Sequence, residues 1–433
     1  GLFAGRLPLV FFTNMPSIAL MAQGSAVAST TYALDGTITP DAALNKFKGG
    51  LVTDVTKIRE LLGAPATITP EQGSLPKNFA GVDHNFKMPQ VWKTAIAIDG
   101  QVPVSFPLSF TAEFTFTKKI HDVMLDNYNI KSNEGWETLK GTGDDRYVYP
   151  NDYRYYKNIN SACVLTNTSK GYGWTFNFTV NAEPVQNLNL MAAYTHTVMK
   201  ELTGMPGNNA YSTWANMYAV QGPNFLELGN SRYVIPDRLI ASASYKYAKE
   251  HFSLFYTGYS PSGYSYYYDG DINGDGNRYD LMYIPKDEND IHFTNPADAD
   301  LFWKFVNQDS YLKNHKGEYA EPYSARAPFV HRFDFRWAHD FDVKIGQTKN
   351  KLVLSLDIMN VGNLFNSKWG VEKNMAGCNN GKILKVNKIV NGVPYFSMYK
   401  NKSTGEAPTS TWSFNHNYNQ CWKMQIGVKY VFN

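Results

Sequence analysis

The chain has 433 residues, with 41 lysines and arginines against 38 acidic residues and a net charge of +3 at pH 7. This near-balance, without a dense basic tract, excludes a nucleic-acid partner. The three cysteines, Cys163, Cys378 and Cys421, are too few and too scattered for a disulfide framework or a zinc site. No apolar run approaches the ~18 residues of a membrane-spanning helix, which excludes helical membrane proteins.

Apolar residues alternate with polar ones in segment after segment, which predicts about ten β-strands. The stretch SFPLSFTAEFTFT at 105–117 places Phe110, Phe114 and Phe116 on one face, and the final stretch WKMQIGVKYVF at 422–432 has the same period. The complete set in chain order is 5–13, 91–98, 105–117, 172–180, 188–198, 238–247, 252–259, 329–343, 352–361 and 422–432.

The predicted connections are alternately short and long. Short ones lie at 99–102, 183–186, 248–251 and 346–350, and polar segments of roughly 28 to 74 residues lie at 14–87, 126–171, 203–231, 260–328 and 365–420. Helices are expected within two long segments, in 39–62 and from Asn295 and Pro296 to about Lys313. Short turns at one end and long loops at the other are typical of outer-membrane barrels.

The apolar face of these strands is dominated by Phe, Trp and Tyr, whereas the packed interior of a β-sandwich favours Val, Ile and Leu. Tyrosine and tryptophan near strand ends suit the two interfaces of a membrane. The opposite face carries charged residues that a watered lumen accommodates, namely Glu113, Arg332, Asp334, Arg336 and Lys429. The expected fold is therefore all-β, a transmembrane antiparallel β-barrel; a soluble aromatic-rich β protein is the alternative.

Four segments carry a resemblance to a known family. The segment LDIMNVGNLFNSKWG at 356–370 is similar to the penultimate-strand signature of TonB-dependent receptors, with its Asn-Leu-Phe-Asn step at 363–366. The segments at 86–99, 271–285 and 301–341 resemble modules of the Oar-like group of these receptors, and they occur in the same order. The chain thus resembles the Oar-like TonB-dependent receptors of Bacteroidota.

This resemblance implies an address in the bacterial outer membrane and a barrel of about 22 strands. It also implies an N-terminal plug domain and a TonB box, which we do not find in this chain. About ten strands cannot enclose a lumen of that size. We therefore expect residues 1–433 to be the C-terminal part of a receptor barrel. Either these residues are a fragment of a longer chain, or the first half of the receptor is a separate polypeptide. A small barrel of ten strands that closes on itself is the remaining alternative.

The most specific local motif is DGDINGDGNRYD at 269–280. Asp271, Asn273 and Asp275 at alternate positions, followed by Gly276, match the start of a calcium loop, and Asn277 follows. Position twelve is Met282, where an EF-hand needs Glu, so Asp280 or a distant residue has to close the site. The alternative is a solvated turn. We predict a calcium site of Asp271, Asn273, Asp275, Asn277 and Asp280.

A tyrosine-rich stretch, SPSGYSYYYDG, precedes this motif. Its rings, Tyr264, Tyr266, Tyr267 and Tyr268, are candidates for stacking on sugars or packing against peptide side chains. Interfacial or loop-packing tyrosines are the alternative. The chain shows neither an HExxH pair nor a GxSxG elbow, so we expect no enzymatic activity.

The expected function is energy-coupled uptake of a large or scarce substrate, which is a peptide, protein, glycan or metal chelate. Outer-membrane lipid surrounds such a barrel, and the resemblance implies coupling to TonB–ExbB–ExbD through the missing N-terminal part. The alternative is a structural or adhesive outer-membrane barrel within a larger surface complex. A surface lipoprotein is a further expected partner.

Overall fold

The computed structural model describes residues 1–6, 77–261, 263–346 and 348–432. The predicted helices at 39–62 lie outside these residues, as does most of the predicted strand at 5–13. Gly5 and Arg6 are described and belong to no strand, while a short strand precedes them.

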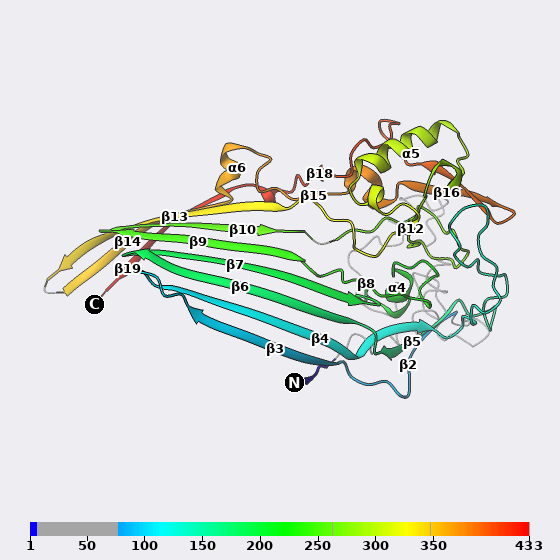
Figure 1. Ribbon diagram of the computed structural model, residues 1–433, viewed down its shortest axis with the longest axis horizontal. Helices are drawn as coiled ribbons and strands as arrows, with labels where there is room; N and C mark the ends of the chain where they lie inside the picture. The colour runs from blue at the N-terminus through cyan, green and yellow to red at the C-terminus, as the bar shows by residue number, and fades with distance from the viewer. Residues whose placement is uncertain (7–76, 262, 347, 433) are drawn as a thin grey trace, which may run out of the picture.

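A sheet of 13 strands dominates the structure (Figure 1). Its main path runs antiparallel through β1 (Leu2–Ala4), β3 (Gln90–Gln101), β4 (Leu108–Asn127), β6 (Tyr172–Val185), β7 (Leu188–Glu201), β9 (Asp237–Tyr247), β10 (Glu250–Tyr259), β13 (Val330–Ile345), β14 (Thr348–Met359) and β19 (Lys423–Val431). The prediction of an all-β antiparallel architecture is confirmed. Nine of the ten predicted strands are present on this path.

Strand pairing sorts the side chains into two faces. On one face rings and aliphatic groups pair across strands, as in Phe114 opposite Phe176 and Trp337 opposite Leu356. Many of these side chains are exposed; the exposed fraction is 62% for Ile98 and 70% for Ile426. We call this face the apolar face.

The other face of the sheet is polar. Arg336 pairs with Asp357 at 2.7 Å, and Asp340 accepts hydrogen bonds from His251 at 3.1 Å and Lys351 at 2.9 Å. We call it the polar face. The alternation predicted from the sequence is therefore realised in three dimensions, because successive side chains of a strand point to opposite sides.

The connections divide by length between the two ends of the strands (Figure 1). Short turns join β3 to β4, β6 to β7, β9 to β10 and β13 to β14, whereas residues 128–171, 202–236, 260–329 and 360–422 form long loops at the other end. We call these four long loops together the cap. This division confirms the predicted pattern for the connections that are described, while most of the predicted long segment at 14–87 lies outside the described residues.

The cap contains short helices and strands. The helices are α4 (Ala210–Ala215), α5 (Ala297–Gln308) and α6 (Val361–Phe365), with 3₁₀ turns η2 (Glu288–Asp290), η3 (Leu312–Asn314), η4 (Ala376–Gly381) and η5 (Tyr418–Gln420). Short strand pairs are β11 (Tyr283–Ile284) with β12 (Glu318–Tyr319), and β15 (Lys373–Asn374) with β18 (Ser413–Phe414). No helix in the described part of the chain has the length and apolar character needed to cross a membrane.

Helix α5 confirms the helix predicted to follow Asn295 and Pro296, but it ends earlier. Asp309 stops it, since its carboxylate accepts hydrogen bonds from the backbone N–H groups of Tyr311 at 2.9 Å and Leu312 at 2.8 Å. These bonds start η3, so the predicted helix is divided in two.

The longest strands found within the segments predicted as loops lie in two of these segments. Residues 126–171 include β5 (Ser161–Thr168), which pairs with β4 and, in parallel, with β2 (Asn78–Val82). Residues 365–420 include the hairpin of β16 (Leu384–Val390) and β17 (Val393–Met398). Asn391 and Gly392 make its turn with φ values of 52° and 83°, the left-handed conformation of a two-residue hairpin turn. The last small strand, β8 (Gly229–Asn230), pairs with β7.

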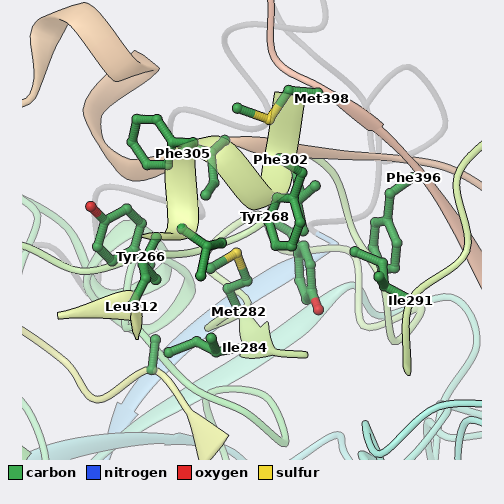
Figure 2. Packing of buried hydrophobic residues seen from close by; sticks show 14 of the residues in the cluster. Tyr266, Tyr268, Met282, Ile284, Ile291, Phe302, Phe305, Leu312, Phe396 and Met398 are labelled. Carbon is green, nitrogen blue, oxygen red and sulfur yellow. The ribbon is translucent and has the colours of Figure 1, made fainter. Parts of the chain in front are cut away.

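The fully buried apolar side chains lie mainly in the cap (Figure 2). The larger cluster joins α5 to the loops around it, with Phe302, Phe305 and Met282 at most 1% exposed. Leu139 of the loop at 128–171 and Phe396 of β17 also belong to it. The cap is therefore a folded unit assembled from separate loops.

Replacing Phe305 by Ala tests this core. We expect the free energy of opening of the cap to fall by about 3–5 kcal/mol, because a buried ring is lost and a cavity remains. Hydrogen exchange of cap amides measures it. Lys304→Ala, at an exposed neighbouring position of the same helix, is the control and is expected to change it by less than about 0.5 kcal/mol. Equal effects of the two substitutions would contradict a packed cap.

Candidate functional site

The loop at 271–280 folds around the side chain of Asp271. Its two carboxylate oxygens accept hydrogen bonds from the backbone N–H groups of Gly274 at 2.7 Å and Gly276 at 2.8 Å. Both glycines have positive φ, 83° and 87°. A side chain at either position would strain this turn, which is why glycine suits the motif.

The same turn brings the other predicted ligands inward. Asn273, Asp275, Asn277 and Asp280 are all buried, with exposed fractions of 0%, 4%, 6% and 2%. Asp271, Asp275 and Asp280 each place one carboxylate oxygen within 4.8 Å of the others. Asp280 thus lies close enough to Asp271 and Asp275 to close the site in place of Met282. This is one of the two possibilities that the sequence analysis left open.

The second oxygen of Asp275 has no hydrogen-bond partner among the described residues. This Oδ2 atom is buried, while Oδ1 accepts a hydrogen bond from the backbone N–H of Asn277 at 2.6 Å. The amide nitrogens of Asn273 and Asn277 are likewise buried without partners. Polar atoms left in this state are costly and rare in folded proteins.

Burial dominates the electrostatics of the loop. It raises the pKa of Asp275 to about 6, and the nearby charge of Asp271 adds to the shift. Burial and the charge of Asp275 raise the pKa of Asp280 well above its usual range. Burial therefore disfavours the charged forms of both carboxyl groups.

A buried arginine lies beside this acidic group. The guanidinium of Arg146 is fully buried, donates from Nε to Asp144 at 2.8 Å, and donates from Nη2 to the carbonyl of Leu281 at 2.7 Å. It lies over the rings of Tyr268 and Tyr319, at 5.1 Å and 5.4 Å from their centroids. The charge of Arg146 also acts on Asp280, but its ion pair is with Asp144, so one guanidinium stands against Asp144 and the three carboxylates of the loop.

The sequence analysis did not identify Arg146. It lies in a polar stretch, GDDRYVYP, whose composition is that of an exposed turn. Only the packing of one loop against another buries it, and no local pattern reports that packing.

The four predicted tyrosines are mostly inside the cap. Tyr266 is 0% exposed and donates to Asp309 at 2.8 Å, and Tyr268 is 2% exposed and stacks on Phe396 at 5.1 Å between ring centroids. Protein covers both rings, so the expectation that they stack on a substrate is corrected. Tyr267 is also buried, against Tyr218 and Tyr279.

Tyr264 is only half-buried and packs edge-on against Trp412 at 5.6 Å. For Tyr264, contact with a substrate stays a prediction. The tyrosines of the cap with the largest exposed fractions, which the sequence analysis did not single out, are Tyr155, Tyr156, Tyr233 and Tyr418.

A cavity of about 270 Å³ lies next to the acidic loop. Asp275 and Gly276 line it together with Asn127, Tyr153 and Trp214. Its walls come from β4, the loop at 128–171, α4 and the loop at 260–329. The acidic loop is therefore placed where several separate loops meet.

No family model matches the chain, and no curated protein sequence matches it. Among solved structures, the chain is similar to the outer membrane transporter YddB from Escherichia coli, with a TM-score of 0.38 and 10% sequence identity. The similarity covers 84% of this chain and 35% of that one. The chain thus spans about a third of the length of the transporter.

Replacing Arg146 by Met tests whether the buried ion pair supports the cap. We expect a loss of about 3–5 kcal/mol in the free energy of unfolding of the cap, because the Asp144 carboxylate is left buried without its cation. Thermal unfolding followed by near-UV circular dichroism measures it. Lys140→Met breaks an exposed pair with Glu137 on the same loop and is expected to cost less than about 1 kcal/mol. An Arg146→Met variant whose cap unfolds at the wild-type temperature would contradict a stabilising role of the buried ion pair.

Proposed function

We propose that this chain forms part of the wall and the cap of an outer-membrane barrel transporter. The observation that carries the proposal is the two-faced sheet, with exposed rings on one side and ion pairs on the other. The short turns would face the periplasm and the cap the outside of the cell, the arrangement that outer-membrane barrels share.

Lipid is the environment that suits the apolar face. Exposing a large apolar side chain to water costs about 1.5–3 kcal/mol relative to burying it. Tens of such side chains lie along these strands, among them Ile96, Ile426 and Val428, which are 65%, 70% and 69% exposed. Strands of 9 residues in β19 and 20 residues in β4 are long enough to cross a bilayer at a tilt.

The polar face suits a watered interior. A hollow of about 910 Å³ opens on this face near the short turn between β3 and β4. Polar side chains such as Gln101, Ser109 and Asn181 line it together with apolar ones such as Val104 and Phe106. Solvated ion pairs such as that of Arg336 and Asp357 carry little desolvation cost there.

We further propose that transport is coupled to energy through TonB. It is supported by the resemblance of the segments at 271–285, 301–341 and 356–370 to TonB-dependent receptors. A plug domain and TonB box from residues outside this chain would engage TonB–ExbB–ExbD, and further strands would close the ring between β19 and β1. No pairing joins these two strands in the described residues.

The cap would capture a peptide, protein, glycan or metal chelate that is too large or too scarce for diffusion, without a covalent step. A surface lipoprotein would assist this capture. The alternative is a structural or adhesive barrel whose cap binds a partner on another surface. Such a barrel would have the same wall but would not import a substrate.

Deletion of the gene in the source organism separates these two functions. We expect slower growth on one class within a panel of peptides, proteins, glycans and metal chelates as limiting nutrients. Deletion of the TonB gene should reproduce that defect, since import then lacks its energy source. Growth unchanged on the whole panel, together with lost surface attachment, would contradict transport and favour the adhesive barrel.

A further inference from the structure

The acidic loop at 271–280 buries more negative charge than its surroundings balance. Asp275 and Asp280 are 4% and 2% exposed, and Asp271 is half-buried beside them. None of the three forms an ion pair with a lysine, arginine or histidine that the structure describes. Arg146 attracts Asp280 but already forms an ion pair with Asp144, so the charged forms of these buried carboxylates would be stabilised by a further cation.

An unpartnered atom points to where that cation would bind. The Oδ2 atom of Asp275 is buried and accepts no hydrogen bond from any described group. It lies near Gly222 of the neighbouring loop, where an added Cβ atom would come within 2.8 Å of it and within 2.2 Å of the Tyr149 hydroxyl. Glycine at position 222 therefore lets this oxygen and the Tyr149 hydroxyl approach the same point of the backbone.

We propose that the loop binds one calcium ion through the carboxylates of Asp271, Asp275 and Asp280. All of the available ligand atoms are oxygens, which excludes the soft metals that prefer sulfur and imidazole. Calcium takes 6–8 oxygen ligands with flexible geometry, which suits carboxylates on a loop, whereas magnesium requires a near-ideal octahedron. The side chains of Asn273 and Asn277 lie in the same turn, where Asn273 Oδ1 accepts a hydrogen bond from the backbone N–H of Asp275 at 3.0 Å.

The position of the loop indicates what the ion does. The carbonyl of Asn273 accepts a hydrogen bond from the N–H of Tyr149 at 2.7 Å, which belongs to the loop at 128–171. Next to Asp280, Leu281 donates its N–H to the carbonyl of Ala219, in the loop at 202–236, at 2.9 Å. Neutralising the carboxylates would thus hold three loops of the cap together.

The smaller buried cluster of the cap depends on the same contacts. Tyr149, Ala219 and Trp214 belong to it, and Tyr149 also donates from its hydroxyl to the carbonyl of Gln221 at 3.0 Å. The calcium ion therefore links the acidic loop to a core built by its neighbours. This inference does not rest on transport, because the same ion would stabilise the cap of an adhesive barrel.

Calorimetric titration of the purified protein, stripped with EDTA, tests the proposal with calcium chloride as the only titrant. We expect binding at one site. Asp275→Asn and Asp280→Asn, which keep the shape of the side chain, should each weaken binding by about tenfold or more. Asp300→Asn, at an exposed carboxylate on α5 of the same long loop, is the matched control and should bind as the wild type does.

Hydrogen exchange supplies the second measurement and stays informative if a variant fails to fold, because the wild-type protein suffices. With calcium, the amides of Tyr149 and Leu281 should exchange more slowly than in EDTA. Absence of calcium binding by the wild type would overturn the site, and so would binding that persists in both Asp variants. Binding without a change in exchange would overturn the role in joining the loops.

Discussion

The constraint on which the structure depends is the period of two in its strands. Backbone hydrogen bonds join neighbouring strands edge to edge, so each strand must present alternate side chains to opposite sides of one sheet. In this chain the rings of Phe114, Phe176 and Trp337 gather on one side, while Arg336, Asp340 and Asp357 gather on the other. The sheet therefore has one apolar face and one polar face.

The location of the buried core follows from this separation. A sheet whose apolar face is turned outward cannot use that face to build a protein core. The fully buried side chains accordingly lie mainly in the cap, where Phe302, Phe305 and Tyr266 from one long loop meet Phe396 from another. The long connections are thus folded structures in their own right, and charged groups such as Arg146 are buried where they meet.

Much of the sheet could be predicted because its signal is local. The alternation at 172–180 and 252–259 is sufficient to identify β6 and β10, and Asn295 with Pro296 marks the start of α5 closely. Strand β5 was missed because its pairing with β2 and β4 is long-range. The hairpin of β16 and β17 does carry a local signal, its Asn391–Gly392 turn, which the sequence analysis overlooked.

The candidate site shows the same limit. The spacing of Asp271, Asn273 and Asp275 was readable from the sequence, and Asp280 could be named as one candidate to close the loop. Whether a side chain is covered depends on contacts between loops that are far apart in the chain. Sequence reasoning therefore could not decide between substrate contact and loop packing for Tyr266 and Tyr268, and it overlooked Arg146. The period of two along a strand shows which side chains share a face of the sheet. Burial in the cap depends instead on how the separate loops pack together.

The central claim is that the apolar face meets lipid, and two neighbouring positions of β19 test it most directly. In a Cys421→Ser background, which removes the exposed cysteine, an environment-sensitive fluorophore is attached to Ile426→Cys or to Gln425→Cys. Ile426 lies beside Leu356 on the apolar face, and Gln425 lies beside Asp357 on the polar face. In bilayers with spin-labelled acyl chains, the account predicts strong quenching at 426 and little at 425. Equal quenching at both positions, or none at 426, would contradict it.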